Sequence, residues 1–172
     1  AGAGGVSGVS GDSIGDGVAS PLGPPGGQDA LAATDTTVYV GGAFTTAGVS
    51  PRNYLAAFDA STATETAWDP SPTGEVYTMT ISGGDLYCGG NIQRLKGVSR
   101  SNLAALDRQT GAPTAWNPGT DGAVRAIKVL GSNIFVGGDF SVAVQSSAHL
   151  AVLSAVTGQL VSAGTSVPSP IY

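Results

Sequence analysis

A segment of 48 residues occurs three times in this chain, and this repeat constrains the fold more than any other feature. Residues 38–44 (VYVGGAF) return as 86–92 (LYCGGNI) and as 134–140 (IFVGGDF), so the Gly-Gly pair advances from 41 to 89 to 137. Residues 55–59 and 68–70 also return 48 positions later, as 103–107 and 116–118. Several landmarks that agree on one spacing indicate a structural repeat.

Each repeat is predicted to contain four short strands. In the second repeat, residues 76–81 alternate between two faces, and a Ser-Gly-Gly-Asp turn at 82–85 leads into a second strand at 86–88. A longer connection leads to a third strand at 103–106. A Thr-Gly turn at 107–111 then leads to a fourth strand at 114–116, which Pro118 ends because proline has no amide hydrogen to donate.

The pattern predicts an all-β fold of β-propeller type, with about three four-stranded antiparallel blades of 48 residues. The second and third strands are apolar on both faces, so each sheet must be covered on both sides, as stacked blades are. We expect blade 1 at 29–75, blade 2 at 76–123 and blade 3 at 124–172. Three blades form an incomplete ring, since propellers commonly have about four to eight.

The two ends of the sequence fit the same frame. Residues 1–28 form a Gly/Ser/Pro-rich segment in which 18–28 stand where the end of a preceding blade would lie. Ile171 and Tyr172 fall where Val76 and Tyr77 begin their blade, so we expect the first residues of a next blade there.

Charge argues against a nucleic-acid-binding module, and hydropathy excludes a transmembrane protein. Twelve acidic and seven basic residues give a net charge of −5, the opposite of what phosphate contacts to a nucleic acid need. No apolar run approaches the roughly 20 residues that span a bilayer. Only 11 % of the residues are charged, which fits sheets that are covered on both faces.

The repeat resembles a known family. An apolar-aromatic pair before Gly-Gly, then Arg-x-x-Leu-Ala-Ala, Thr-Gly and Trp-x-Pro, is similar to the delta-sixty repeat β-propellers of bacterial secreted and surface proteins. The resemblance covers about residues 29–172 and implies repeat architecture and an extracellular or cell-surface location. The third repeat departs from it, because Ser154 replaces the aspartate and no tryptophan follows Thr157-Gly158.

Two groups of side chains are candidate contact residues. Trp68 and Trp116 are aromatic surfaces suited to contacts with glycans or a partner. Packing between blades also explains them, and we favour packing because both tryptophans lie at one position of the repeat. Arg94, Lys96 and Arg100 are a candidate anion or partner patch, with an ordinary solvated loop as the alternative.

No catalytic, cofactor or metal residues are predicted. His149 is the single histidine and Cys88 the single cysteine, which we expect to be a buried, unreactive thiol. Asp59 and Asp107 recur before turns and are expected to accept backbone hydrogen bonds there. The Gly/Ser/Asp stretch at 10–17 reads as a linker rather than a calcium turn.

The expected function is a non-enzymatic, extracellular structural or interaction module: a scaffold, an adhesive surface component or a self-assembling subunit. Its partners would be itself or further blades of the same parent protein. The alternative is a propeller that binds or cleaves polysaccharide, or a fragment of a larger secreted enzyme. Such an enzyme would need a carboxylate pair, and Glu65, Asp69, Glu75 and Asp121 are the candidates.

Overall fold

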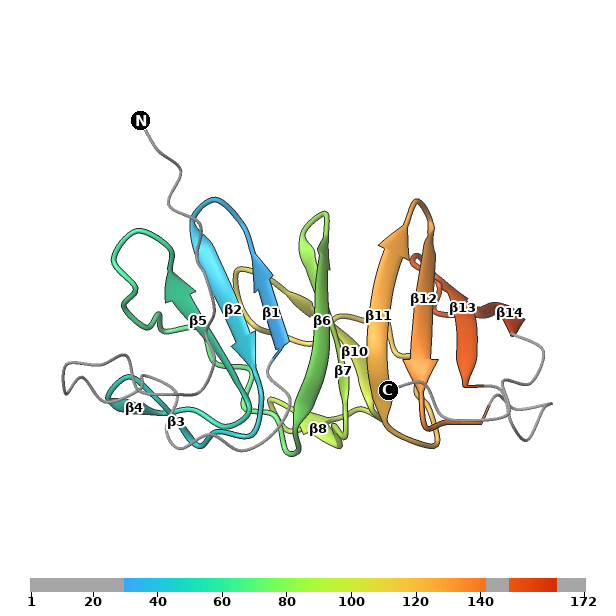
Figure 1. Ribbon diagram of the computed structural model, residues 1–172, viewed down its shortest axis with the longest axis horizontal. Coiled ribbons are helices and arrows are strands. Elements are labelled where there is room, and N and C mark those ends of the chain that lie inside the picture. Colours follow the sequence, from blue (N-terminus) through green and yellow to red (C-terminus); the bar gives the residue numbers. More distant parts are fainter. Residues whose placement is uncertain (1–29, 142–148, 164–172) are drawn as a thin grey trace.

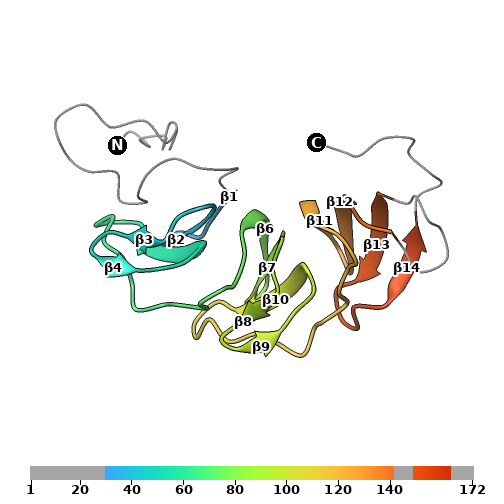
Figure 2. The same ribbon diagram turned by 90° about the horizontal axis from the view of Figure 1, so that it is seen from below.

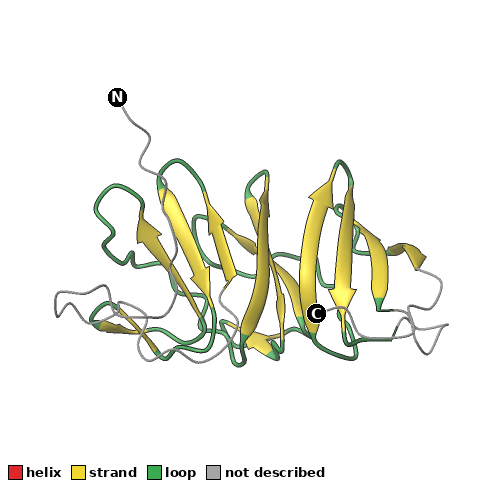
Figure 3. Ribbon diagram, viewed as in Figure 1, coloured by secondary structure: helices red, strands yellow, loops and turns green. Residues whose placement is uncertain are grey.

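The computed structural model describes residues 30–141 and 149–163. This part of the chain forms antiparallel strands joined by turns and loops and contains no helix (Figure 3). Accordingly, none of the described residues belongs to a helix that could cross a membrane. The expected preceding-blade segment at 1–28, the linker at 10–17 and the next-blade residues 171–172 lie outside the described residues.

Each repeat forms one main sheet, which we name a blade. Blade 1 consists of β1 (Ala30–Ala33), β2 (Thr37–Gly41) and β5 (Leu55–Asp59). Blade 2 consists of β6 (Val76–Ser82), β7 (Asp85–Gly90) and β10 (Leu103–Asp107). Blade 3 consists of β11 (Val124–Leu130), β12 (Asn133–Gly138), β13 (Leu150–Ser154) and β14 (Leu160–Ala163).

The three blades stand side by side in an open arc (Figures 1 and 2). The first strand of each blade lies on the concave inner side, and β6 contacts both β1 and β11. The described residues therefore form stacked propeller blades that do not close a ring, which confirms the predicted fold class.

The predicted fourth strand forms regularly only in blade 3. In blade 2, the expected strand at 114–116 is absent, and a single bridge joins Leu106 to Pro113. Pro113 has no amide hydrogen, and the carbonyl of Thr114 accepts a hydrogen bond from Arg100 (2.6 Å). Blade 1 likewise has only a bridge, from Phe58 to Glu65. In blade 3, Leu160 occupies the position of Pro113 and β14 pairs with β13.

The connection between the second and third strands contains a small hairpin that the sequence analysis did not predict. In blade 1 it is β3 (Thr46–Ala47) with β4 (Ser50–Pro51), and in blade 2 it is β8 (Arg94–Leu95) with β9 (Val98–Ser99). Leu95 is fully buried, and Lys96 N donates to the carbonyl of Pro70 (2.7 Å). The hairpin of blade 2 thus covers the outer part of the contact with blade 1.

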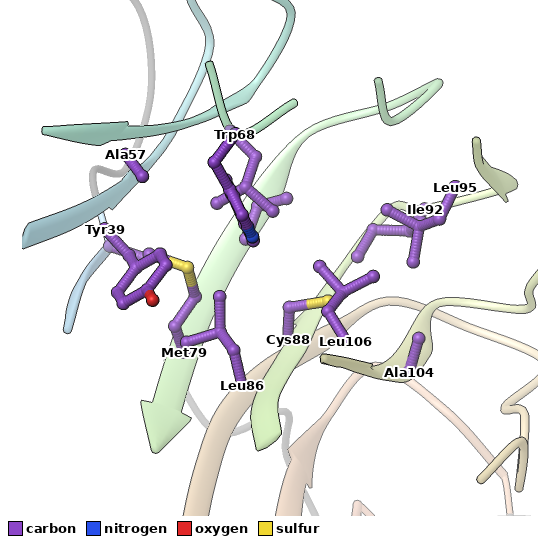
Figure 4. Packing of buried hydrophobic residues seen from close by; sticks show 13 residues of the cluster. Tyr39, Ala57, Trp68, Met79, Leu86, Cys88, Ile92, Leu95, Ala104 and Leu106 are labelled. Carbon is purple, nitrogen blue, oxygen red and sulfur yellow. The ribbon is translucent and has the colours of Figure 1, made fainter. Parts of the chain in front are cut away.

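The core is divided by the blades. One apolar cluster fills the first joint, between blades 1 and 2, and includes Tyr39, Leu55, Met79 and Leu86 (Figure 4). A second cluster fills the second joint, between blades 2 and 3. Both faces of blade 2 are therefore buried, because Leu86 points into the first joint and its neighbour Tyr87 into the second.

Candidate interaction site

In blades 1 and 2, the first glycine of the Gly-Gly pair admits a side chain from the next blade. A Cβ atom on Gly41 would lie 2.8 Å from Cγ1 of Val76, and one on Gly89 would lie 2.5 Å from Cγ1 of Val124. Both distances are far inside van der Waals contact, so only glycine allows the valine at the start of the inner strand to approach. The most visible sequence motif is thus a docking slot for the following blade.

A tryptophan of one blade lies on a glycine of the next. The ring of Trp68 contacts Gly111, where a Cβ atom would be 3.2 Å from the indole nitrogen, and Trp116 contacts Gly158 at 3.4 Å in the same way. Trp116 also donates from Nε1 to the carbonyl of Ser154 (3.0 Å).

The two tryptophans are interior residues. Trp68 is 8 % and Trp116 6 % exposed. Each packs edge-to-face against a tyrosine of its own blade with 5.1 Å between ring centroids, and Figure 4 shows the pair of Trp68 and Tyr39. Sugar stacking needs an open aromatic face, which neither ring offers here. The burial therefore favours packing between blades over a glycan contact.

The three cations of the candidate patch point to backbone carbonyls. Arg100 is buried and donates to the carbonyls of Ser99 and Thr114, and Arg52 bonds the carbonyl of Thr66 at the same place in blade 1. Lys96 Nζ donates to the carbonyl of Thr110 (2.6 Å). Arg94 donates to the carbonyl of Gly97 (3.1 Å). Arg100 has a structural role, whereas Arg94 and Lys96 are exposed, and their contact with an anion or partner stays a prediction.

Asp59 and Asp107 act as the predicted turn acceptors. Oδ1 of Asp59 accepts hydrogen bonds from the hydroxyls and amides of Ser61 and Thr62, and these bonds lower the pKa of Asp59 to about 2. Oδ1 of Asp107 accepts from the hydroxyl and amide of Thr110, with the same downward effect on its pKa. Ser154 takes this position in blade 3.

Cys88 and His149 occupy interior and structural positions. Burial raises the pKa of the Cys88 thiol to about 12, with a smaller opposing effect of Arg100, so the thiol stays protonated at neutral pH. Nδ1 of His149 lies 3.0 Å from the carbonyl oxygen of Gly138.

A polar cluster at the inner edge of the second joint was not predicted. A β-bulge near the start of β6 lies at Tyr77, and one near the start of β11 lies at Arg125. The Arg125 guanidinium lies 5.5 Å from the centre of the Tyr77 ring and pairs with Asp139 (2.7 Å). Burial, and then a hydrogen bond with Glu75, raises the pKa of Tyr77. The cluster ties blade 2 to blade 3, and the sequence pattern carries no signal for it, because a β-bulge has no fixed residue type.

The four candidate carboxylates have different partners, and Glu75 bonds Tyr77 as described above. Asp69 pairs with Arg52 (3.7 Å) and Asp121 accepts from the amide of Ser141 (2.6 Å), while Glu65 bonds the hydroxyl of Ser50. Each of these three carboxylates thus bonds a residue of a different connection of the chain. Among the described residues, no group of three or more His, Cys, Asp or Glu side chains could hold a metal ion.

A cavity of about 520 Å³ opens at the outer part of the second joint, between Pro118 and Asp121 of the connection and Phe140 and Leu153 of blade 3. Leu95 fills the corresponding place in the first joint. The counterpart of the Leu95 hairpin in blade 3 falls within residues 142–148, which lie outside the described residues. The cavity therefore supports no ligand assignment.

Blade 3 has one face without a neighbouring blade among the described residues. Phe135, Leu150 and Val152 occupy the positions that Tyr87, Leu103 and Ala105 occupy in blade 2. The blade 2 residues are buried in the second joint, whereas those of blade 3 are only partly buried. We name Phe135, Leu150 and Val152 the open face.

Comparisons with known proteins agree with the fold. The chain is similar to the computationally designed Ika8 protein, with a TM-score of 0.52 and 17 % sequence identity over 83 % of this chain. The match spans 37 % of the designed chain, which is a propeller-like repeat protein. No protein-family model and no curated protein matches the sequence.

Proposed function

We propose that this chain is a non-enzymatic structural or interaction module of an extracellular or cell-surface protein, of the delta-sixty repeat type. It works by joining propeller blades face to face. The open face would take up a further blade, which either another part of the same parent protein or a second copy supplies.

The open face carries this proposal. At both existing joints, the residues at these three positions are the buried half of an apolar contact. In blade 3 the same positions keep large apolar side chains, Phe135, Leu150 and Val152, which remain partly exposed. Burial of such apolar surface contributes about 25 cal/mol per Å². This gain favours a partner that has the shape of a propeller blade. By analogy with the slots at Gly41 and Gly89, the partner would be a blade whose inner strand begins with a branched aliphatic residue.

Thiol labelling of three variants, each with one cysteine added to the native Cys88, tests the proposal. Val152→Cys reports on the open face, Ala105→Cys on the filled second joint, and Val49→Cys on a turn residue that is 98 % exposed. The native Cys88 is silent, because it is buried with a raised pKa.

The expected result is slow labelling at position 105, fast labelling at 49, and labelling at 152 that slows as the protein concentration rises. Labelling at 152 as fast as at 49 at every concentration, and also in the longer parent protein where one exists, contradicts the docking of a further blade.

A further inference from the structure

One face of blade 1 is buried although no described blade lies against it. Val40, Ala56 and Phe58 point away from blade 2 and are only 5 %, 1 % and 8 % exposed. Blade 1 stands at one end of the arc (Figure 2), and the described members of this apolar cluster all belong to blade 1. We name Val40, Ala56 and Phe58 the first face.

The two other blades provide a comparison for this burial. The equivalent residues of blade 2, Cys88, Ala104 and Leu106, are buried because they lie in the first joint. On blade 3, the open face has no described neighbour and stays partly exposed. The first face is thus nearly as well buried as a filled joint.

The inner strand shows that the cover of the first face is narrower than a blade. Met79 and Ile127 are buried in the joints, where each contacts the first glycine of the preceding Gly-Gly pair. Leu31 holds the same position in blade 1 but is 49 % exposed. The cover of the first face therefore does not include the inner strands of a further blade.

The connection that enters a blade also packs closely against it. In the first joint, the amide of Asn91 donates to the carbonyl of Glu75 (2.9 Å). A Cβ atom on Gly74 would overlap the carbonyl oxygen of Asn91, so this position requires glycine. Residues 118–123 make the same two contacts with Asp139 in the second joint.

The segment before blade 1 has the sequence of such a connection. Gly26 stands 48 positions before Gly74, at the place where glycine is required. Two fully buried prolines of the first joint also have apolar equivalents here, namely Leu22 for Pro70 and Pro24 for Pro72.

Gln28 distinguishes this segment from the other two connections. It occupies the position of Val76 and Val124, whose side chains enter the glycine slots. A glutamine amide in such an apolar slot would lose its hydrogen bonds with water. The inner strand of blade 1 is therefore not suited to the slot of a preceding blade.

We propose that residues 18–27 cover the first face and cap blade 1 in place of a whole blade. The segment leads directly into β1, it is apolar at the contact positions, and a strip of this width leaves Leu31 exposed. A blade from a second copy or from another protein would instead bury Leu31 and confront Gln28 with a glycine slot. Capping of a terminal repeat is a general need of stacked arrays.

The cap leaves the open face of blade 3 as the single face at which a further blade docks, and this consequence rests on the proposed function. Chains that meet through the open face can then form pairs but no longer stacks. The covering of the first face does not depend on the proposed function.

A disulfide tests the place of the segment in the full chain. Thr73 and Arg94 form a β-bridge in the first joint, and the equivalent positions at the first face are Pro25 and Thr46. On mild oxidation, Pro25→Cys with Thr46→Cys should form an intramolecular disulfide, as should Thr73→Cys with Arg94→Cys. The mismatched pair Pro25→Cys with Arg94→Cys should not. A disulfide between 73 and 94 without one between 25 and 46 overturns the cap.

Thiol labelling of Ala56→Cys measures the cover itself. Position 56 should react as slowly as Ala104→Cys in the first joint. Gly26→Val should displace the segment and speed labelling at 56 at least about tenfold, while labelling at 104 stays slow because the blades remain folded. Gly11→Val is the matched control and should change neither rate. Labelling at 56 as fast as at Val49→Cys, or unchanged by Gly26→Val, overturns the cap.

Labelling at Val152→Cys separates this inference from the proposed function. If position 152 is never protected but the disulfide between 25 and 46 forms, the cap holds and the docking of a further blade fails. Sedimentation over a range of concentrations tests the single docking face. Species no larger than two chains are expected, and longer stacks would contradict it.

Discussion

Trp68 of blade 1 rests directly on Gly111 of blade 2, at a turn where the backbone of Gly111 has a φ of 68°. Two features of the structure favour glycine at this position. The left-handed conformation disfavours any side chain, and a Cβ atom would lie only 3.2 Å from the indole nitrogen, a tight contact. Trp116 and Gly158, with a φ of 73°, repeat the relationship at the second joint.

Gly111→Ala should therefore lower the free energy of unfolding by about 1–3 kcal/mol, since it adds backbone strain and a close contact with Trp68. Urea denaturation followed by tryptophan fluorescence measures the change.

Blade 1 supplies the opposite substitution. Ala63 stands at the position of Gly111 with a φ of 56°, and its side chain is exposed. Ala63→Gly should raise the free energy of unfolding by up to about 1 kcal/mol, because it removes the left-handed strain. If Gly111→Ala and Ala63→Gly change the free energy of unfolding in the same direction, the φ of this turn is not the cause.

The sequence alone predicts most of the architecture but not the contacts that hold the blades together. The repeat locates the strands at 76–81, 86–88 and 103–106, because alternation and turn residues are local signals. It does not show that Arg100 bonds the Thr114 carbonyl in place of a fourth strand, because the two residues are 14 positions apart and meet only in the folded chain. The sequence also did not predict the cluster of Tyr77, Arg125 and Asp139. These residues meet only in the folded chain, and a β-bulge has no fixed residue type by which the sequence could show it.

Arg100 should matter for stability more than its neighbours in the candidate patch. Arg100→Met removes a buried donor from the Thr114 carbonyl and should cost about 1–3 kcal/mol of the free energy of unfolding. Arg94→Met changes an exposed side chain and should alter stability by no more than about 0.5 kcal/mol. Equal losses in the two variants, measured by urea denaturation, would argue against the structural role of Arg100.

Acid should weaken the turns that Asp59 and Asp107 cap. Both carboxyl groups have a lower pKa in the folded protein than in the unfolded chain, so their stabilisation is fully present above about pH 4. For Asp59 it is lost as the pH falls towards about 2. Unfolding measured between pH 2 and pH 6 should show this decline in wild-type protein and a shallower one in the Asp59→Ala, Asp107→Ala double variant. Parallel curves of the free energy of unfolding against pH for the two proteins would contradict this role of Asp59 and Asp107.

The central claim is that consecutive repeats stack face to face through the glycine slot, and a double-mutant cycle at Gly89 and Val124 tests it most directly. Gly89→Ala should destabilise by about 1–3 kcal/mol through overpacking, and Val124→Ala by roughly 1–3 kcal/mol through lost burial. The double variant loses the closest contact of the new methyl group, the one with Cγ1 of Val124. The cost of the double variant should therefore be smaller than the sum of the two single costs by at least about 1 kcal/mol. Gly84→Ala, with no atom within 4 Å of the added methyl group, is the control and should be uncoupled from Val124→Ala. Strictly additive costs for Gly89 and Val124 would contradict the stacking of blades 2 and 3.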